Sequence, residues 1–177
     1  GQGIDVTIEA IPKNILLRPK VLMSARRFDA VILQKKLLNS LDFAILRRSS
    51  KILGFDFDDA IYLKDAAPSE DPSMYRSATR MSKFVRIVGA CDFAIAANNV
   101  LVAKVRELFP NLPLSVVPSQ VPVSATPAKK TYGLSSPPVL GWISSSVTLR
   151  YLYFIREALV ELAKRRNFVL KVVADKA

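Results

Sequence analysis

The fold is decided by a stretch that reads ILGFDFDDA, residues 52–60. Its first six residues form a short run rich in aromatic and branched side chains, which is typical of a strand buried in a parallel sheet. Aspartates interrupt and follow the end of that run. Because ligands of open α/β sheets bind beyond the carboxyl ends of the strands, the stretch predicts a buried strand and the place of a site.

Similar apolar runs recur along the chain and alternate with segments of helical period. Such alternation predicts a parallel sheet flanked by helices. We therefore expect an α/β protein with a Rossmann-like parallel sheet whose strands are buried on both faces. The predicted strands are Val6–Ile8, Ala30–Leu33, Ile52–Phe57, Phe93–Ala96, Leu114–Val117, Val139–Ile143 and Phe168–Val173.

Segments between these runs carry apolar residues three and four positions apart, which predicts amphipathic helices. We expect helices at Leu38–Ile45, Met74–Val88 and Leu101–Leu108. The longest predicted helix is Thr148–Arg166, where Glu161 and Arg165 stand four residues apart and favour an ion pair. Its predicted buried stripe consists of Leu149, Leu152, Ile155, Leu159 and Leu162.

The composition changes between Pro118 and Pro138, a stretch with five prolines and no regular period. We predict a first Rossmann-like domain at residues 1–122, a linker at 123–138 and the first strand, helix and strand of a second one at 139–177. A unit of two strands is smaller than the usual ~5 to 6 strands of a sheet, so we expect a fragment of a longer protein. The first strand of the front domain is also expected to be missing. A single continuous sheet through both parts would contradict this interpretation.

The composition excludes several classes of enzyme. The absence of histidine removes Ser-His-Asp triads, Cys-His pairs and the usual zinc sites, and the single cysteine, Cys91, excludes an internal disulfide. Lys and Arg number 26 against 15 Asp and Glu, which gives a net charge of +11 and favours polyanionic partners. No apolar run approaches the ~18 residues that span a bilayer, so we expect a cytoplasmic protein.

The aspartates Asp56, Asp58 and Asp59 are the first candidate site. Carboxylates this close repel one another and need a cation, a helix N-terminus or hydrogen-bond donors nearby. Two alternatives stay open. The residues can simply cap the following turn, or Asp56 and Asp58 can form the Asp-x-Asp pair of a haloacid-dehalogenase-like phosphatase. The second alternative lacks the later acidic pair that such catalysis needs.

The turn that contains Ser144, Ser145, Ser146 and Thr148 is the second candidate site. It joins a predicted strand to the start of the longest predicted helix. Free backbone N–H groups, the positive end of the helix dipole and the hydroxyl groups would together hold a phosphate or diphosphate. The alternative is that these residues only cap the helix.

A basic stripe on the Met74–Val88 helix is the third candidate, formed by Arg76, Arg80, Lys83 and Arg86. Their spacing predicts one cationic face that contacts anionic headgroups or phosphates. The alternative is a solvated face with no partner. Aromatic residues do not alternate with these bases and no nucleic-acid-binding motif is present, so no nucleic acid is expected as a partner.

Five motifs in this order resemble bacterial GT-B glycosyltransferases of the retaining group 1, or family-4-like, kind. They are FDAVILQK at 28–35, ILGFDFDDA at 52–60, ACDFAIAAN at 90–98, VVP at 116–118 and GWI at 141–143.

This resemblance implies an acceptor-binding first domain and a second domain that binds a nucleotide-sugar, with the reaction in the cleft between them. The acceptor would be a saccharide or a lipid-linked sugar in surface polysaccharide synthesis. The donor diphosphate would lie at the serine turn and the acceptor near the aspartates. No metal and no cofactor besides the nucleotide-sugar is expected, and contact with an anionic inner membrane is expected to be peripheral.

We expect this chain to have little or no transferase activity of its own, since transfer needs donor and acceptor held together by two complete domains. The rival interpretation is a non-catalytic α/β binding module that resembles receiver domains. That rival predicts Mg²⁺ binding at Asp56 and Asp58, whereas the transferase interpretation predicts none.

Overall fold

The computed structural model describes residues 3–65, 71–120, 131, 133, 135–145 and 148–175. The described chain divides into two compact units, residues 1–64 with 73–120 and residues 65–72 with 121–177. The elements of the first unit are η1 (Ile15–Leu17), α1 (Arg18–Ser24), η2 (Ala25–Arg27), β1 (Ala30–Gln34), α2 (Ser40–Ser49), β2 (Ile52–Phe57), α3 (Ala78–Ala90), β3 (Phe93–Ala96), α4 (Asn99–Leu108) and β4 (Leu114–Val116). A 3-10 turn, η3 (Pro72–Tyr75), precedes α3. The second unit contains β5 (Val139–Ser144), η5 (Leu149–Ile155), α5 (Arg156–Arg165) and β6 (Val169–Ala174).

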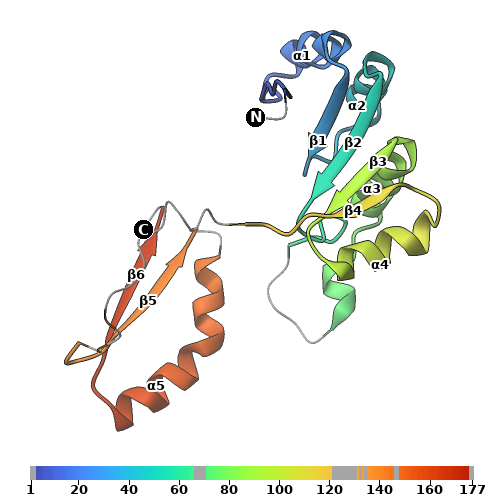
Figure 1. Ribbon diagram of the computed structural model, residues 1–177. Coiled ribbons are helices and arrows are strands. Elements are labelled where there is room, and N and C mark those ends of the chain that lie inside the picture. Colours follow the sequence, from blue (N-terminus) through green and yellow to red (C-terminus); the bar gives the residue numbers. More distant parts are fainter. Residues whose placement is uncertain are drawn as a thin grey trace. The chain divides into compact units, whose positions relative to one another are not determined.

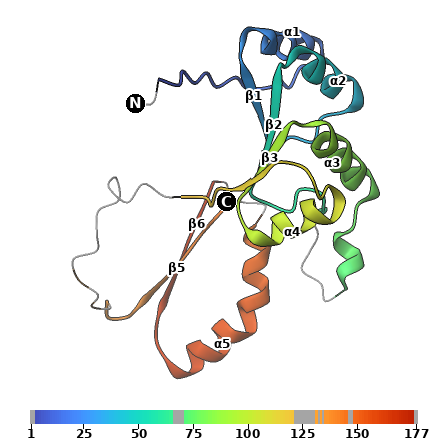
Figure 2. The ribbon, with the colours of Figure 1, turned by 45° about the vertical axis from the view of Figure 1, so that its right-hand side comes forward.

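The predicted α/β class is confirmed. In the first unit four parallel strands pair in the order β1-β2-β3-β4, with α2, α3 and α4 in the connections (Figure 1). Crossovers between neighbouring parallel strands are right-handed in nearly all proteins, so strands added at one edge receive these helices on one face of the sheet. Figure 2 shows α2 and α3 on the same side. The architecture is thus a parallel sheet of Rossmann-like type, wound in one direction.

The core of the first unit lies between that face of the sheet and the helices. Alternate side chains of the central strand, Leu53, Phe55 and Phe57, are fully buried. The ring of Phe84 on α3 packs edge-on against Phe57 with centroids 5.3 Å apart, and Tyr62 lies 5.0 Å from the same ring. Such aromatic burial removes a large apolar area from water and dominates the stability of a small domain.

The prediction that the strands are buried on both faces is wrong for this sheet. Ile32 and Ile52 point away from the core and are 53% and 46% exposed. The physical reason is the strand order, because a sheet that always adds strands at the same edge receives all its crossover helices on one face.

The predicted strand Val6–Ile8 is also wrong. These residues have the alternating apolar pattern of a strand, but in the described part of the chain they pair with no strand and their apolar side chains are exposed. An isolated extended segment has no backbone partner to stabilise it, so the pattern alone does not make a strand.

Two helix starts differ from their predictions. The helix predicted from Met74 begins at Ala78, because Ser77 accepts a hydrogen bond from the Arg80 N–H and acts as the N-cap. The helix predicted over Thr148–Arg166 is a 3-10 helix up to Ile155 and an α-helix only from Arg156. Its predicted apolar stripe is not buried, so packing against a core does not stabilise one regular α-helix here. Tyrosine and phenylalanine, which are frequent in this segment, also have a lower helix propensity than alanine or leucine.

In the second unit β5 and β6 pair in parallel and form a sheet separate from the four-stranded one. The continuous sheet that would contradict the two-domain interpretation is therefore not found. The expected i,i+4 pair is present, with Arg165 Nη2 3.0 Å from Glu161 Oε1. Much of the predicted linker lies outside the described residues, and the bounds 1–122 and 139–177 stay predictions. No helix in the described part of the chain combines the length and apolar character needed to cross a bilayer.

Candidate functional site

The carboxyl ends of β1 and β2 bring polar side chains together. The two strands are parallel and in register, with Gln34 opposite Asp56. The residue after each strand continues this pairing, since the N–H of Lys35 donates to the carbonyl of Asp56 at 2.8 Å. Side chains that leave β1 and β2 at this point therefore face the same edge of the sheet.

Each of the first two aspartates at this edge has a donor at the end of β1 or directly after it. Gln34 Nε2 donates to Asp56 Oδ2 at 2.9 Å. The ammonium of Lys35 donates to Asp58 Oδ2 and forms an ion pair with it. The sequence required a cation or donors near these carboxylates, and the neighbouring strand supplies both. We call the group Gln34, Lys35, Asp56, Asp58 and Asp59 the acidic edge.

The ion pair changes the acid–base properties of its two members. The hydrogen bond from Lys35 lowers the pKa of Asp58 below its ordinary value, and the same hydrogen bond raises the pKa of Lys35. Both groups are thus charged at neutral pH. Three carboxylates and one ammonium leave the acidic edge with a formal charge of −2.

Two further features mark this edge. Lys35 has a φ of 52°, the one positive φ at a residue other than glycine in the described chain. Side chains with a Cβ adopt this left-handed region at a cost, and such residues gather at functional sites. Asp58 Oδ1 is buried and accepts no hydrogen bond from the described residues, so one carboxylate oxygen keeps acceptor capacity.

Sequence reasoning placed Asp56, Asp58 and Asp59 at a strand end, but it missed Gln34 and Lys35 as members of the same site. The signal was present, because Gln34 is the last residue of β1 and Lys35 follows it. Recognising it required the knowledge that β1 lies directly beside β2.

The serine turn of the second unit uses much of its polarity internally. The carbonyl oxygen of Ser145 accepts the N–H groups of Thr148 and Leu149 at 3.0 and 3.1 Å. The hydroxyls of Ser145 and Thr148 lie 3.1 Å apart, and Trp142 Nε1 donates to Ser144 Oγ at 3.0 Å. Ser146 lies outside the described residues.

These contacts change the phosphate cradle predicted there. The N–H groups of Thr148 and Leu149 already have an acceptor, and the element that follows is a 3-10 helix whose aligned dipole is shorter than that of the predicted helix. The turn carries hydroxyl groups and lies at the carboxyl end of β5, as predicted. Thr148 precedes the first residue of this 3-10 helix, and the α-helix that was expected to begin there begins instead at Arg156.

A cation that sequence reasoning missed stands next to this turn. Arg150 forms an ion pair with Asp65, and its guanidinium lies 5.2 Å from the ring centroid of Tyr151. The Tyr151 hydroxyl donates to the same carboxylate at 3.2 Å. The second unit therefore holds a fixed guanidinium two residues beyond Thr148.

The predicted basic stripe is not a single free cationic face. Arg76 precedes α3. Arg80 Nη1 donates to the carbonyl of Leu63 at 2.5 Å, and Arg86 donates to the carbonyl of Leu38 and the hydroxyl of Ser40, both at 2.9 Å. Lys83 is half-buried. Arg80 and Arg86 therefore already donate to neighbouring backbone carbonyls and to Ser40, and the contact of these residues with anionic headgroups stays a prediction.

The described residues contain no group of three or more carboxylate, thiol or imidazole side chains placed to hold a metal ion. Comparison with known proteins gives no match to a family model, a curated protein or a solved structure.

Proposed function

We propose that this chain belongs to a GT-B glycosyltransferase of the retaining group 1 kind, in which the first unit binds the acceptor and the second binds the nucleotide-sugar donor. The resemblance of the five motifs led to this hypothesis. Two separate parallel α/β sheets, each with polar residues after its strands, support it. The observation that carries the assignment of roles is the charge and hydrogen bonding of the acidic edge.

The acidic edge suits a ligand with hydroxyl groups better than one with phosphates. Carboxylate oxygens accept hydrogen bonds from hydroxyls, and charge-assisted bonds of this kind are roughly twice as strong as neutral ones. Two like charges 4 Å apart near a protein surface repel by about 4 kcal/mol. A diphosphate beside Asp56 and Asp58 would meet that repulsion, whereas an uncharged saccharide would not.

The donor side of the proposal rests on the turn after β5. Hydroxyl groups of Ser144, Ser145 and Thr148 and the guanidinium of Arg150 belong to one short segment. Arginine and hydroxyl donors are the groups that stabilise a leaving diphosphate when no metal is used. The sugar would be transferred in the cytoplasm, where the nucleotide-sugar is supplied, to a saccharide or lipid-linked acceptor. The product would contribute to surface polysaccharide.

Nuclear magnetic resonance of the ¹⁵N-labelled chain tests the two roles separately. We expect neutral oligosaccharides to shift the amide signals of residues 34, 35, 56 and 58. We expect UDP or GDP to shift those of residues 144, 145 and 148–150, and each ligand to leave the other set unchanged. Nucleotides that bind at the acidic edge would contradict the assignment of roles.

The rival hypothesis of a receiver-like module or a phosphatase is tested in the same sample with Mg²⁺ alone. Saturable shifts at Asp56 and Asp58 on addition of Mg²⁺ would favour the rival. Asp58→Asn should weaken oligosaccharide binding at least tenfold, because it removes the charged acceptor and its pair with Lys35. Asp29→Asn is the matched control, since Asp29 is fully exposed and pairs with Lys51 at the opposite end of β1.

A further inference from the structure

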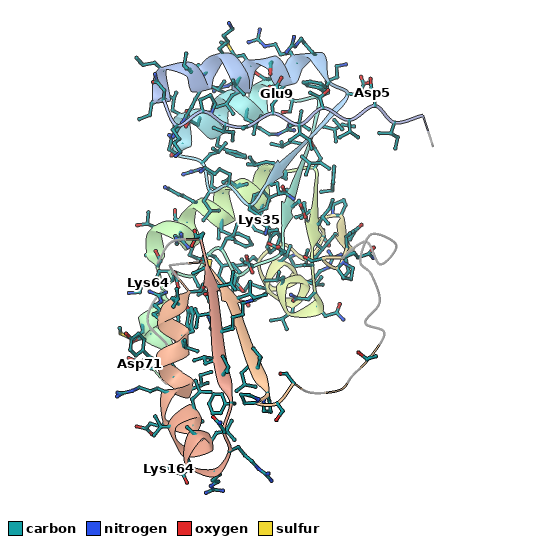
Figure 3. All side chains as sticks on the ribbon, turned by 90° about the vertical axis from the view of Figure 1, so that its left-hand side faces the viewer. Asp5, Glu9, Lys35, Lys64, Asp71 and Lys164 are labelled. Carbon is teal, nitrogen blue, oxygen red and sulfur yellow. The ribbon has the colours of Figure 1, made fainter. Side chains whose placement is uncertain are left out.

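The segment between β1 and α2 carries Lys35 into the acidic edge. Lys35 is the first residue after β1, and its φ of 52° lies in the left-handed region that side chains with a Cβ adopt at a cost. Figure 3 shows Lys35 where β1 ends. Such a conformation persists only where the surrounding structure fixes the chain around it. The contacts of this segment therefore decide whether the Lys35 ammonium reaches Asp58.

Backbone and capping contacts hold the two ends of the segment. At its start the N–H of Lys35 donates to the carbonyl of Asp56 at 2.8 Å. At its end Asn39 caps α2, because its Oδ1 accepts the N–H of Asp42 and its Nδ2 donates to Oδ2 of the same residue, both at 2.8 Å. Asp42 is buried and pairs with Arg18. The end of the segment is thus anchored to the core of the first unit.

Arg86 of α3 adds a contact from a different element. Its Nη2 donates to the carbonyl of Leu38 and its Nη1 to the hydroxyl of Ser40, both at 2.9 Å. Leu38 lies three residues after Lys35 and is buried, and Nε of Arg86 is buried as well. Hydrogen bonds from a guanidinium are charge-assisted, and its planar shape fixes the directions of the donors. Arg86 therefore fixes the segment after β1 relative to α3.

The partner of Lys35 is held from the same helix. Arg80 Nη1 donates to the carbonyls of Leu63 and Ile61 at 2.5 and 3.4 Å, in the segment that follows Asp58. The helix α3 thus contacts both of the segments whose side chains meet as Lys35 and Asp58.

We infer that Arg86 is a positioning residue of the acidic edge, which holds the segment after β1 so that Lys35 meets Asp58. In this arrangement Lys35 occupies one oxygen of Asp58 and leaves the buried Oδ1, which has no partner among the described residues, to accept a hydrogen bond from a ligand. Without Arg86 the segment can relax to an ordinary backbone conformation that moves the ammonium away. The effect of Arg86 on ligand binding rests on the proposed function, whereas its effect on the ion pair does not.

Carboxyl NMR of the ligand-free chain tests the inference without any sugar. In the wild type the hydrogen bond from Lys35 lowers the pKa of Asp58. In Arg86→Gln we expect this pKa to rise toward the ordinary 3.8, because the ion pair loosens. Arg86→Lys should raise it as well, since lysine keeps the charge but not the planar fork of donors. A rise in Arg86→Gln alone would mean that only the charge of Arg86 acts, and would overturn the inference.

Arg106→Gln is the matched control, because it removes the same charge and the same kind of contact. Arg106 of α4 donates from Nη1 to the backbone carbonyls of Pro110 and Leu112, both at 2.7 Å. These carbonyls precede β4 at the opposite end of the sheet, so the variant should leave the pKa of Asp58 unchanged. Equal rises in Arg106→Gln and Arg86→Gln would show a general effect of charge or stability, and would refute the positioning role.

Ser40→Ala is a milder variant that keeps every charge of the chain. It removes one of the two acceptors of Arg86 and places a good helix former at the first residue of α2, so it should fold even where Arg86→Gln does not. We expect the pKa of Asp58 to rise in the same direction, by less than in Arg86→Lys. An unchanged pKa in both Ser40→Ala and Arg86→Lys, with unchanged circular dichroism, would overturn the inference.

Oligosaccharide binding separates this inference from the proposed function. Where the wild type binds a neutral oligosaccharide at the acidic edge, Arg86→Lys should weaken that binding about tenfold, which corresponds to the loss of one hydrogen bond to a charged group. Arg106→Gln should leave the affinity unchanged. A wild type that binds no oligosaccharide would contradict the proposed function, and the pKa of Asp58 in the variants would still decide the role of Arg86.

Discussion

Strands β2 and β6 have the same length and the same parallel mode of pairing, but they differ in burial. Each contains six residues, is mostly apolar and pairs in parallel with a preceding strand. In β2 the residues Leu53, Phe55 and Phe57 are fully buried, whereas no residue of β6 is buried in the described structure. The difference shows that an apolar strand acquires a core only from its neighbours.

Those neighbours differ in number. Among the described residues β2 has a strand on each side and helices over one face, while β6 pairs with β5 alone and is connected to it by one helical segment. At ~25 cal/mol for each Å² of apolar surface removed from water, stabilisation follows burial rather than composition. The first unit should therefore contribute most of the measurable folding free energy of this chain, and the following predictions test that contrast.

The largest effect is expected from the aromatic core. Phe84→Ala removes a fully buried ring that contacts Phe55, Phe57 and Tyr62, and should lower the free energy of unfolding by about 3 to 5 kcal/mol. Phe154→Ala in the second unit removes a ring that is 58% exposed and should cost under about 1 kcal/mol. Urea unfolding followed by circular dichroism measures both, and equal losses would contradict the contrast.

A smaller effect is expected from the buried ion pair. Asp42→Ala leaves Arg18 without its carboxylate and also removes an acceptor of Asn39, so we expect a loss of about 3 kcal/mol. Glu161→Ala breaks the exposed pair with Arg165 and should cost about 0.5 kcal/mol or less. Thermal unfolding of the two variants side by side checks this ratio.

Glycines distinguish the two sheets more finely. A Cβ on Gly54 would lie 2.3 Å from the Phe93 ring, so Gly54→Ala should force that ring aside and destabilise by about 1 to 3 kcal/mol. A Cβ on Gly141 of β5 meets no atom within 4 Å. Gly141→Ala should therefore be neutral, or stabilising by about 0.5 kcal/mol. A clear loss of stability in Gly141→Ala would mean that β5 is packed more closely than described.

The smallest effect is expected from pH at the acidic edge. The pKa of Asp58 is lowered from its ordinary 3.8 by the hydrogen bond from Lys35, so the unfolded chain takes up this proton first. The stabilisation is complete well above pH 3.8 and is lost as the pH falls through the lower folded value. In Asp58→Asn the stability difference from the wild type should shrink below that pH. If the stability difference between the wild type and Asp58→Asn stays constant as the pH is lowered, the ion pair between Lys35 and Asp58 is contradicted.

The sequence predicted the six strands found among the described residues, because short branched and aromatic runs are specific enough when they alternate with helical periods. It placed Asp56 and Asp58 at a strand end for the same reason. It could not predict that Val6–Ile8 would remain unpaired, nor that Leu149–Ile155 would be a 3-10 helix. Both outcomes depend on whether a partner surface is present, and residue pattern does not contain that information.

The acidic edge shows the same limit to what the local sequence predicts. Local sequence determined where β1 and β2 begin and end, since each strand is defined by residues next to one another in the chain. Only the tertiary structure decided that these two strands are neighbours, and therefore that Lys35 neutralises Asp58 across 23 positions of sequence. Local pattern acts through short-range backbone preferences, whereas pairing and burial are set by residues distant in sequence that meet only after the chain has folded.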